Sequence, residues 1–599
     1  MSRSSGLPAL TPPGFWPSLL LRMMKGLQRL LQGVGRLAAR LRTWPYLGRT
    51  AFAVGLLAMM FLASQRHHLE NPAEVAGYDV RDGRLIAEAG VPAAGPLLRT
   101  VSLLLPYLDT WMLVGGGILL FTLLRQWGNP VKLVFPSWVA GLSVAAWAIC
   151  ADIAQHLGPM QMTELGEPPV LAAYWVKLVM IGLAALCLPT LVNYYVRQGA
   201  LERYTLRTFF APLVFCFIAF TSLWMIMDLL DNLKEFQDVG SSARQVLLFY
   251  VGIIPFIYVS VMPAALLLAI LYTLTRMSRA NEIVAMLGSG RSVGQILRPI
   301  FAVAVGAALL STAANYHWAP RAEGNRKAVL RAMGERQKDS IRAYALLHRD
   351  PVTRRVWYVG SFPFSLREGR LRSVQVREFD ADSRLLRVLH ADSATWRPDG
   401  RWRFFDGREV RYREGRPALV QPFPGAASAN DPAGGVFETR DFTETPWSMV
   451  SYALKAESMG VPEMVSYLKT HANDPAEKLA DFRAHLHHRF AMPWQSLALA
   501  LVAAPLGIAW SRRGAVGGIA GSIFLFFGVL FLNNLCLNLA KGGHLPAATA
   551  AWIPHAVFGS LGLFLLHLRS QNRDLPRLSL DFLFKRKPAL VRPRRRAAA

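Results

Sequence analysis

Residues 246–275 read VLLFYVGIIPFIYVSVMPAALLLAILYTLT and contain no charged side chain. A helix that crosses a bilayer needs about 20 mostly apolar residues, so this stretch is longer than one crossing requires. Pro255 and Pro263 lie inside it, and we expect the segment to kink, tilt or protrude beyond the bilayer. The stretch predicts an α-helical membrane protein.

Further apolar segments lie on both sides of this stretch. Those in the C-terminal two thirds are 208–227, 299–320, 490–511, 515–540 and 545–568. Those in the N-terminal third are 50–64, 101–124, 133–151 and 169–192. The pattern predicts a polytopic α-helical membrane protein with about ten transmembrane helices. Four belong to a membrane domain of unknown role at 50–200, and six lie within 201–320 and 490–569.

A polar stretch at 321–489 separates the third and fourth helices of the second group. Short alternating segments favour β-strands, and Pro398-Asp399-Gly400 is typical of a turn. The expected strands include 356–359, 373–377, 402–405 and 410–412. We therefore expect an inserted β domain of the sandwich or jelly-roll type, with a loop at 424–435 and helical spacing again from 447 to 488.

The composition narrows the class of protein. Of the 599 residues, 53% are hydrophobic and 18% are charged, which excludes a chain that is disordered throughout. The four cysteines lie in apolar segments, which excludes a disulfide scaffold. A net charge of +27 is typical of proteins that bind nucleic acid. The positions of the charges argue against nucleic acid and favour anionic membrane lipids.

The basic residues also predict the membrane topology. If the N-terminus is cytoplasmic, 29 Lys and Arg residues fall in the inside segments and 7 in the short outside loops. Cytoplasmic loops carry the excess of basic residues. We therefore expect a multi-pass protein of the inner membrane with both termini cytoplasmic, 321–489 periplasmic, and 570–599 as a basic cytoplasmic tail.

The N-terminal residues 1–49 contain a basic amphipathic pattern. Leucines at 27, 30, 31, 37 and 41 share one helical face, and arginines lie roughly opposite. This pattern favours a helix on the cytoplasmic membrane surface, with a disordered basic tail as the alternative. Residues 51–63 are either a retained span or the apolar core of a cleaved signal, and neither alternative changes the later topology.

Motifs of enzyme chemistry are absent from the sequence. It contains no G-x-x-x-x-G-K-[ST], no H-E-x-x-H, no C-x-x-C and no G-x-S-x-G. We expect no active site, no cofactor and no metal site, and we interpret His485, His487 and His488 as interfacial or core residues. The absence of these motifs is the only feature of this kind that favours a transport or assembly role.

Several motifs together carry a family resemblance. They are RYTLR at 203–207, DLLDNL at 228–233, RMSRANEIVAM at 276–286 with GSG at 288–290, HLHHRFAMP at 485–493, APLG at 504–507 and SRRG at 511–514. In this order, with three spans, a β domain and three spans, residues 201–569 closely resemble the lipopolysaccharide export permease family (LptF/LptG, YjgP/YjgQ type). The first 200 residues lie outside the resemblance.

The resemblance implies a function and a set of partners. It implies a transporter subunit that works with a second permease, either of the same family or a second copy. In the implied complex, a separate cytoplasmic ABC ATPase dimer hydrolyses the ATP that drives transport. The complex extracts lipopolysaccharide from the inner membrane and passes it to periplasmic jelly-roll bridge proteins toward the outer membrane.

The cytoplasmic segment 278–290 is the expected contact with the ATPase. Ser278 is suited to cap a helix N-terminus, and Gly288-Ser289-Gly290 to end the helix. Ile283, Met286 and Leu287 share one face, and Glu282 suits the positive N-terminal end. The resemblance implies a coupling helix whose Glu282 pairs with a basic residue of the ATPase. We add Arg279 to this candidate site, and a plain helix-start acid is the alternative role of Glu282.

Polar residues at the ends of two spans form a candidate lipid-binding or lateral-gate site. Asp228, Asp231 and Lys234 lie at helical spacing, and charges at a membrane are costly and usually partnered. Two acids repel phosphate, so Lys234 is the better candidate for a lipid headgroup. Asn533 and Asn534, with Asn538, are spaced to bond another helix, and we favour that role over ligand contact.

Lys177 lies near the middle of an expected span, where a charge needs a partner. Asp109 and Asp152 in neighbouring spans are candidate partners. Such a pair marks either a functional pathway or a structural ion pair of the four-helix unit.

Two readings compete with export of lipopolysaccharide. One is a membrane scaffold or regulatory protein whose four-span unit recruits a partner. The other is export of a different lipid or a lipoprotein. A Glu282→Lys change separates export from the scaffold, because only an exporter needs the ATPase contact.

Overall fold

The computed structural model describes most of residues 130–571, with the longest gaps at 157–169, 327–340 and 426–434. It also describes two strands, β1 (Tyr78–Arg81) and β2 (Arg84–Ala87), and scattered residues between 100 and 116. The chain forms two compact units, residues 1–70 with 106–140 and residues 71–105 with 141–599. The described elements discussed below belong mainly to the second unit.

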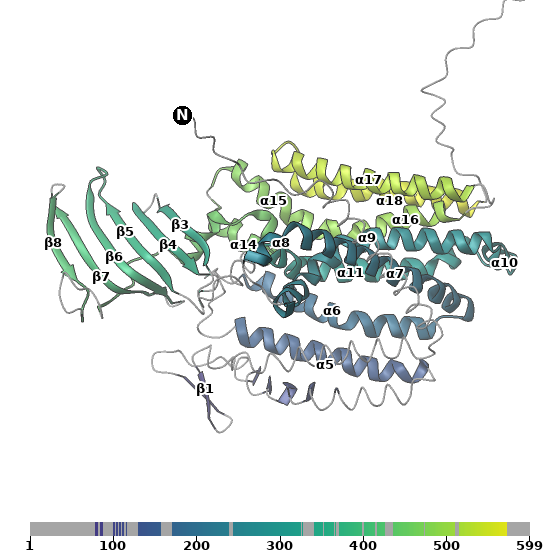
Figure 1. Ribbon diagram of the computed structural model, residues 1–599, viewed down its shortest axis with the longest axis horizontal. Helices are drawn as coiled ribbons and strands as arrows, with labels where there is room; N and C mark the ends of the chain where they lie inside the picture. Colours follow the sequence, from purple (N-terminus) through teal and green to yellow (C-terminus); the bar gives the residue numbers. More distant parts are fainter. Residues whose placement is uncertain are drawn as a thin grey trace, which may run out of the picture. The chain divides into compact units, whose positions relative to one another are not determined.

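Long apolar helices dominate the second unit (Figure 1). They are α6 (Leu171–Arg197), α7 (Ala200–Asp231), α9 (Ala243–Arg279), α11 (Val293–Tyr316), α16 (Gln495–Gly507), α17 (Gly514–Lys541) and α18 (Ala547–Ser570), together with residues 141–156 of α5 (Pro130–His156). Within the described residues, eight helical segments are long and apolar enough to cross a membrane. They confirm the predicted membrane helices of that region. The predicted spans at 50–64 and, apart from isolated positions, 101–124 lie outside the described residues.

The longest helix, α9, contains the stretch that first indicated a membrane protein. It is continuous over 37 residues with Pro255 and Pro263 inside it. At about 1.5 Å per residue this is roughly 55 Å, well beyond a 30 Å hydrocarbon core. Leu266, Ile270 and Leu274 are fully buried against the neighbouring helices. The charge-free stretch of α9 therefore packs inside the bundle and is longer than one membrane crossing.

The β domain follows α11, as predicted. Its strands are β3 (Ile341–Asp350), β4 (Arg355–Pro363), β5 (Leu371–Phe379), β6 (Leu385–Trp396), β7 (Trp402–Arg413), β8 (Arg416–Pro422) and β9 (Val436–Thr439). They form one antiparallel sheet in which β3 to β8 pair in sequence order and β9 pairs with β7. The two predicted strands at 402–405 and 410–412 are parts of the single strand β7.

The core of the β domain is aromatic. Trp402 and Phe404 alternate with less buried neighbours along β7, the period expected of a strand with one covered face. Trp357 from β4 lies 4.8 Å from Trp402, ring centre to ring centre, and Phe442 packs edge-on against Trp357. The Trp402 indole N–H donates to the Glu444 carbonyl at 2.8 Å, so its polar atom is satisfied inside the core.

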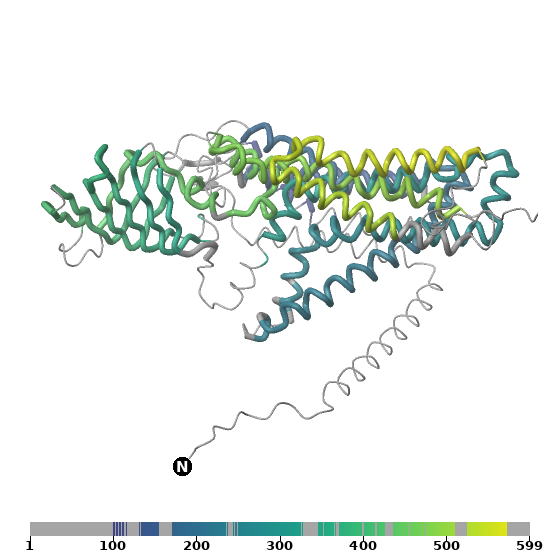
Figure 2. The backbone as a smooth tube through the Cα atoms, turned by 90° about the horizontal axis from the view of Figure 1, so that it is seen from above, coloured from purple at the N-terminus to yellow at the C-terminus, as the bar shows by residue number. Residues whose placement is uncertain are grey.

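Short helices connect this sheet with the last membrane spans. They are α13 (Pro446–Val450), α14 (Val461–Thr470) and α15 (Ala476–Ala491). On α15, Leu479 and Leu486 pack into the core of the β domain, whereas Ala484 packs with Cys536 and Ala540 of α17. The tube in Figure 2 can be followed from the strands through these helices into the C-terminal spans. One helix is thus shared by the β core and the membrane bundle.

Candidate functional sites

A short helix, α10 (Glu282–Gly288), lies between α9 and α11. The left-handed Gly290, at φ 87°, follows its end. There the Gly290 N–H donates to the Leu287 carbonyl and the Arg291 N–H to the Met286 carbonyl. These two bonds form a Schellman motif, which satisfies carbonyls that the last helical turn leaves free. The prediction that residues 288–290 end the helix is confirmed.

The predicted start of this helix is wrong. Ser278 is not its N-cap, because α9 continues to Arg279. Asn281 takes the N-cap position in the left-handed region, at φ 59°, and its side chain makes no capping bond. Asn tolerates this conformation better than most residues. The chain therefore turns sharply over two residues between α9 and α10, and the exposed Arg279 lies on the α9 side of the turn.

The apolar face of α10 points into the membrane bundle. Ile283 and Met286 are buried in the same core as α9 and α11, and Leu287 packs against that core. These three side chains share a face, as the spacing predicts, but they contact this chain's own helices. Val284, 51% exposed, and the exposed Ala285 lie on the opposite side. The buried face therefore fixes α10 to the bundle, and the opposite face is the one that is open to groups from outside the chain.

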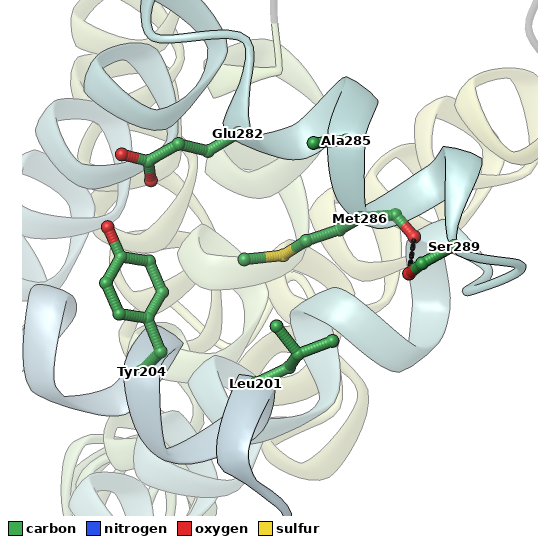
Figure 3. A pocket seen from close by; sticks show the side chains of 6 residues that line it. All are labelled: Leu201, Tyr204, Glu282, Ala285, Met286 and Ser289. Atoms are coloured by element: carbon green, nitrogen blue, oxygen red, sulfur yellow. Dashed lines mark hydrogen bonds between the residues drawn. The ribbon is translucent and has the colours of Figure 1, made fainter.

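Glu282 lines a pocket of about 450 Å³ beside α10. Leu201 and Tyr204 of α7 form one wall, and Met286 and Ser289 form another. Figure 3 shows the Glu282 carboxylate and the Tyr204 hydroxyl pointing toward one another at one side of the pocket. The Oε2 atom of Glu282 is buried and has no hydrogen-bond partner among the described residues. A buried carboxylate oxygen without a partner is costly, so this pocket suits a cationic group from outside the chain.

Asp228 is a buried structural acid. Its Oδ1 lies 2.8 Å from Arg326 Nη1, and the Tyr250 hydroxyl donates to its Oδ2 at 3.1 Å. The Asn232 amide donates to the Asp228 backbone carbonyl. Both carboxylate oxygens are thus occupied by groups of this chain.

Asp231 and Lys234, the other two members of the predicted set, are exposed. Asp231 ends α7, and Lys234 lies in the short helix α8 (Leu233–Asp238). The three charged residues therefore do not converge as one site: Asp228 points into a buried pair, and the other two face outward. A role of Lys234 toward a lipid headgroup stays a prediction.

The asparagines of α17 also differ in their burial. Asn533 is buried and its amide donates to Gln495 of α16 at 3.2 Å, which is a bond between two membrane helices. Asn534 and Asn538 are exposed. The interhelical role favoured for Asn533 is therefore seen, whereas the side chains of Asn534 and Asn538 face outward.

Lys177 and Asp152 form a buried ion pair between α6 and α5. The Lys177 ammonium lies 2.9 Å from Asp152 Oδ1, and both side chains are largely excluded from solvent. Tyr174, one turn before Lys177, lies beside the ammonium, with its ring centre at 6.0 Å. Asp109 belongs to the other compact unit, so its part in this pairing stays a prediction.

Sequence reasoning missed a buried polar cluster at the junction between α11 and α14. Glu463 accepts from Arg321 Nε at 2.5 Å, and the Nδ1 atom of His317 lies 3.3 Å from the same carboxylate. Burial and the Arg321 charge lower the pKa of His317 to about 4, so at neutral pH Arg321 is the cation of the cluster. Despite the burial of Glu463, the neighbouring Arg321 holds its pKa well below the usual range.

A second part of this junction involves Arg489 at the end of α15. The Asn315 amide donates to the Arg489 carbonyl at 2.8 Å, and the Arg489 guanidinium donates to the Glu457 carbonyl. These partners are 174 and 32 residues apart in sequence, and no local spacing marks them. Among the described residues, no group of three His, Cys, Asp or Glu side chains is arranged to hold a metal ion.

Comparison with known proteins adds one finding to this geometry. The profile of the family described as "Lipopolysaccharide export system permease LptF/LptG" matches residues 203–568, more than half of the chain. The match begins within α7 and ends within α18, so it includes α10 and the whole β domain and leaves out the N-terminal helices. No curated protein matches the chain.

Proposed function

Because the chain belongs to the lipopolysaccharide export system permease LptF/LptG family, we propose that it is a permease subunit of an ATP-driven lipopolysaccharide exporter. In this proposal it takes lipopolysaccharide from the inner membrane and passes it to a periplasmic bridge toward the outer membrane. A separate cytoplasmic ABC ATPase dimer supplies the energy. Both termini are cytoplasmic, and the β domain is periplasmic.

The observation that carries the coupling to an ATPase is the state of Glu282. Its buried Oε2 lacks a partner at a pocket that opens beside a short helix between two spans. A positively charged side chain of the ATPase satisfies this oxygen and enters a partly dehydrated site, where an ion pair is stronger than at an open surface. The alternative role as a plain helix-start acid needs no pocket and leaves Oε2 unpaired.

The packing of α10 supports transmission of force. Ile283 and Met286 bury the helix in the bundle core shared with α9 and α11. The same core contains Leu499 and Ala503 of α16, and α16 follows α15, which packs into the β core. A push on α10 therefore reaches the β domain through packed helices, which resist deformation.

The second permease subunit and the lipid acyl chains have a candidate surface on α7 and α17. These helices expose large apolar side chains: Phe215 is 70% exposed on α7 and Phe524 73% on α17. Met227 and Phe531 extend the two faces. We propose that they face a second permease subunit, either of this family or a second copy, and a cavity that holds acyl chains.

Charge reversal of Glu282 tests the coupling. Glu282→Lys is expected to abolish co-purification of the ATPase and release of lipopolysaccharide from membrane vesicles, because one partner of a buried charge pair is reversed. The matched control, Glu477→Lys, changes an exposed acid on α15 and should leave both readouts unchanged.

Two outcomes would contradict the proposal. Unchanged ATPase binding and lipid release in Glu282→Lys would favour the scaffold interpretation. Mass spectrometry of lipid co-purified with the wild-type complex completes the test, since a different lipid as the dominant species would exclude lipopolysaccharide as the substrate.

A further inference from the structure

Helices α6 and α11 enclose an apolar groove that lies apart from the Glu282 pocket. Its volume is about 370 Å³. The α6 wall includes Leu186, Leu191 and Tyr194, and the α11 wall includes Ala302, Val305 and Leu309. The groove therefore lies between the last N-terminal helix, outside the family match, and the third span of the matched region.

The groove has a definite position along the two helices. They pack directly at the end where the Tyr316 hydroxyl donates to the Ala173 carbonyl at 2.8 Å. Because α6 begins near this contact and α11 ends at it, the helices run antiparallel. The groove lies toward the other end, where α6 finishes and α11 starts. In the proposed topology that end is cytoplasmic.

The α6 wall of the groove is about as long as one leaflet of a bilayer is thick. On α6 the lining extends from Leu183 to Tyr194, which is about 16 Å of helix at 1.5 Å per residue. Half of a hydrocarbon core is about 15 Å thick. Gly306 leaves space in the groove because it has no Cβ atom. A Cβ atom added there would lie 3.5 Å from Leu191 Cδ2, so a larger side chain at this position must enter the groove.

Positive charge lies at the proposed cytoplasmic end. Arg298 is exposed and precedes Ala302 by one turn on the same face of α11, and the exposed Arg197 follows Tyr194 by three residues on α6. The Tyr194 hydroxyl, which lines the groove, is buried and has no hydrogen-bond partner in the described part of the chain.

Glu202, an acid at the start of α7, is already paired with Arg291. The described ion pairs include none to Arg197 or Arg298, and Arg197 donates to the Asn193 side chain at 3.1 Å. The apolar groove between α6 and α11 thus has two arginines and an unsatisfied hydroxyl at this end.

We propose that this groove binds one anionic glycerophospholipid of the cytoplasmic leaflet. An acyl chain fills the space between α6 and α11, and the phosphate accepts hydrogen bonds from Arg197, Arg298 and the Tyr194 hydroxyl. The bound lipid fastens the N-terminal helices to the third permease span. The proposal rests on the topology proposed above and is independent of the exported substrate.

Native mass spectrometry of the detergent-solubilised full chain tests this site. The probes are phosphatidylglycerol and phosphatidylcholine with identical acyl chains. Both lipids carry a phosphate, but the choline ammonium cancels its charge in phosphatidylcholine, whereas phosphatidylglycerol keeps a net negative charge that attracts arginine. The wild type should therefore retain phosphatidylglycerol about tenfold or more better than phosphatidylcholine. The double variant Arg197→Gln, Arg298→Gln should lose this preference.

Two further variants distinguish the effect of the arginine charges from the effect of the volume of the groove. Gly306→Leu fills the groove and should lower retention of both lipids, while thermal unfolding of the same sample checks that the protein is folded. Arg207→Gln removes an exposed arginine of α7 outside the groove and should keep the preference. Equal retention of both lipids by the wild type would overturn the proposal, and so would a preference that persists in the double variant. A bound polypeptide in place of the lipid would overturn it as well.

Discussion

The Arg326 guanidinium lies 2.8 Å from the buried Asp228 carboxylate, and the Tyr250 hydroxyl bonds the second oxygen of that carboxylate. This relationship joins α7 to the segment that leads toward the β domain. It assigns Asp228 a structural role, because its oxygens are occupied by groups of this chain. Contact with a lipid phosphate, considered for this residue from the sequence, would require the pair to break.

Asp228→Asn is expected to destabilise the protein by about 3–5 kcal/mol, because it leaves the Arg326 charge without its partner in a mostly buried site. Asp231→Asn alters an exposed acid of the same helix and should have little effect. Thermal unfolding of the two variants in detergent measures the difference. Equal stability would show that the Arg326 pair contributes nothing.

The Lys177–Asp152 pair gives a second test, this time among the N-terminal helices. Lys177→Met leaves a buried carboxylate without its cation and should lower stability by several kcal/mol, about 3–5. Lys177→Met combined with Asp152→Asn removes both charges and should recover most of the loss. If the double variant recovers stability but not lipid export, the pair has a functional role beyond packing.

The end of α10 supplies a matched pair of glycine variants. Gly290 has φ 87°, whereas Gly288 lies within the helix, and an added Cβ meets no atom within 4 Å at either position. Gly290→Ala should therefore cost about 1–2 kcal/mol through backbone strain alone. Gly288→Ala should be neutral or slightly stabilising. Thermal unfolding and ATPase co-purification of both variants check this, and equal effects would refute the role assigned to Gly290.

Acidification should act on the junction between α11 and α14. The pKa of His317 is about 4 in the folded chain, below its usual 6.5, so the unfolded chain binds more protons between these values. Stability therefore falls as the pH drops from 6.5 toward 4, by at most about 1.4 kcal/mol per pH unit from this residue. The carboxylate of Glu463 loses its stabilising contribution only at lower pH, since its pKa is depressed.

Unfolding midpoints at pH 7.5, 6 and 5 test this dependence. His317→Gln cannot take up a proton and should reduce the slope between pH 6.5 and 5. His544→Gln, at an exposed histidine, should leave the slope unchanged. An identical acid response in wild type and His317→Gln would contradict a buried, neutral His317.

Sequence patterns predicted those features that repeat along the chain. Charge-free stretches such as 246–275 revealed the membrane helices, and alternation around Trp402 revealed the β domain. Gly288-Ser289-Gly290 gave the end of α10, because a Schellman motif depends on local residues. The start at Ser278 was missed because tertiary packing extends α9 past it, with Ser278 itself buried.

The long-range contacts that determine the roles of individual residues could not be predicted from the local spacing of residues. Asp228 and Arg326 are 98 residues apart, and Arg321 and Glu463 are 142 apart. An acid at a helix end looks the same in the sequence whether it is paired or exposed. Likewise, the periodicity of Ile283 and Met286 located an apolar face but could not tell whether a partner or the chain's own bundle covers it.

Accessibility labelling tests the central claim, that α10 and the β domain act on opposite sides of one membrane. The four cysteines at 150, 187, 216 and 536 are first replaced by serine. Single cysteines then replace Val284, 51% exposed on α10, and Leu347, 71% exposed on β3. In intact spheroplasts a membrane-impermeant maleimide should label the cysteine at 347 and reach the one at 284 only after permeabilisation. Labelling of both cysteines before permeabilisation, or of neither, would contradict the account.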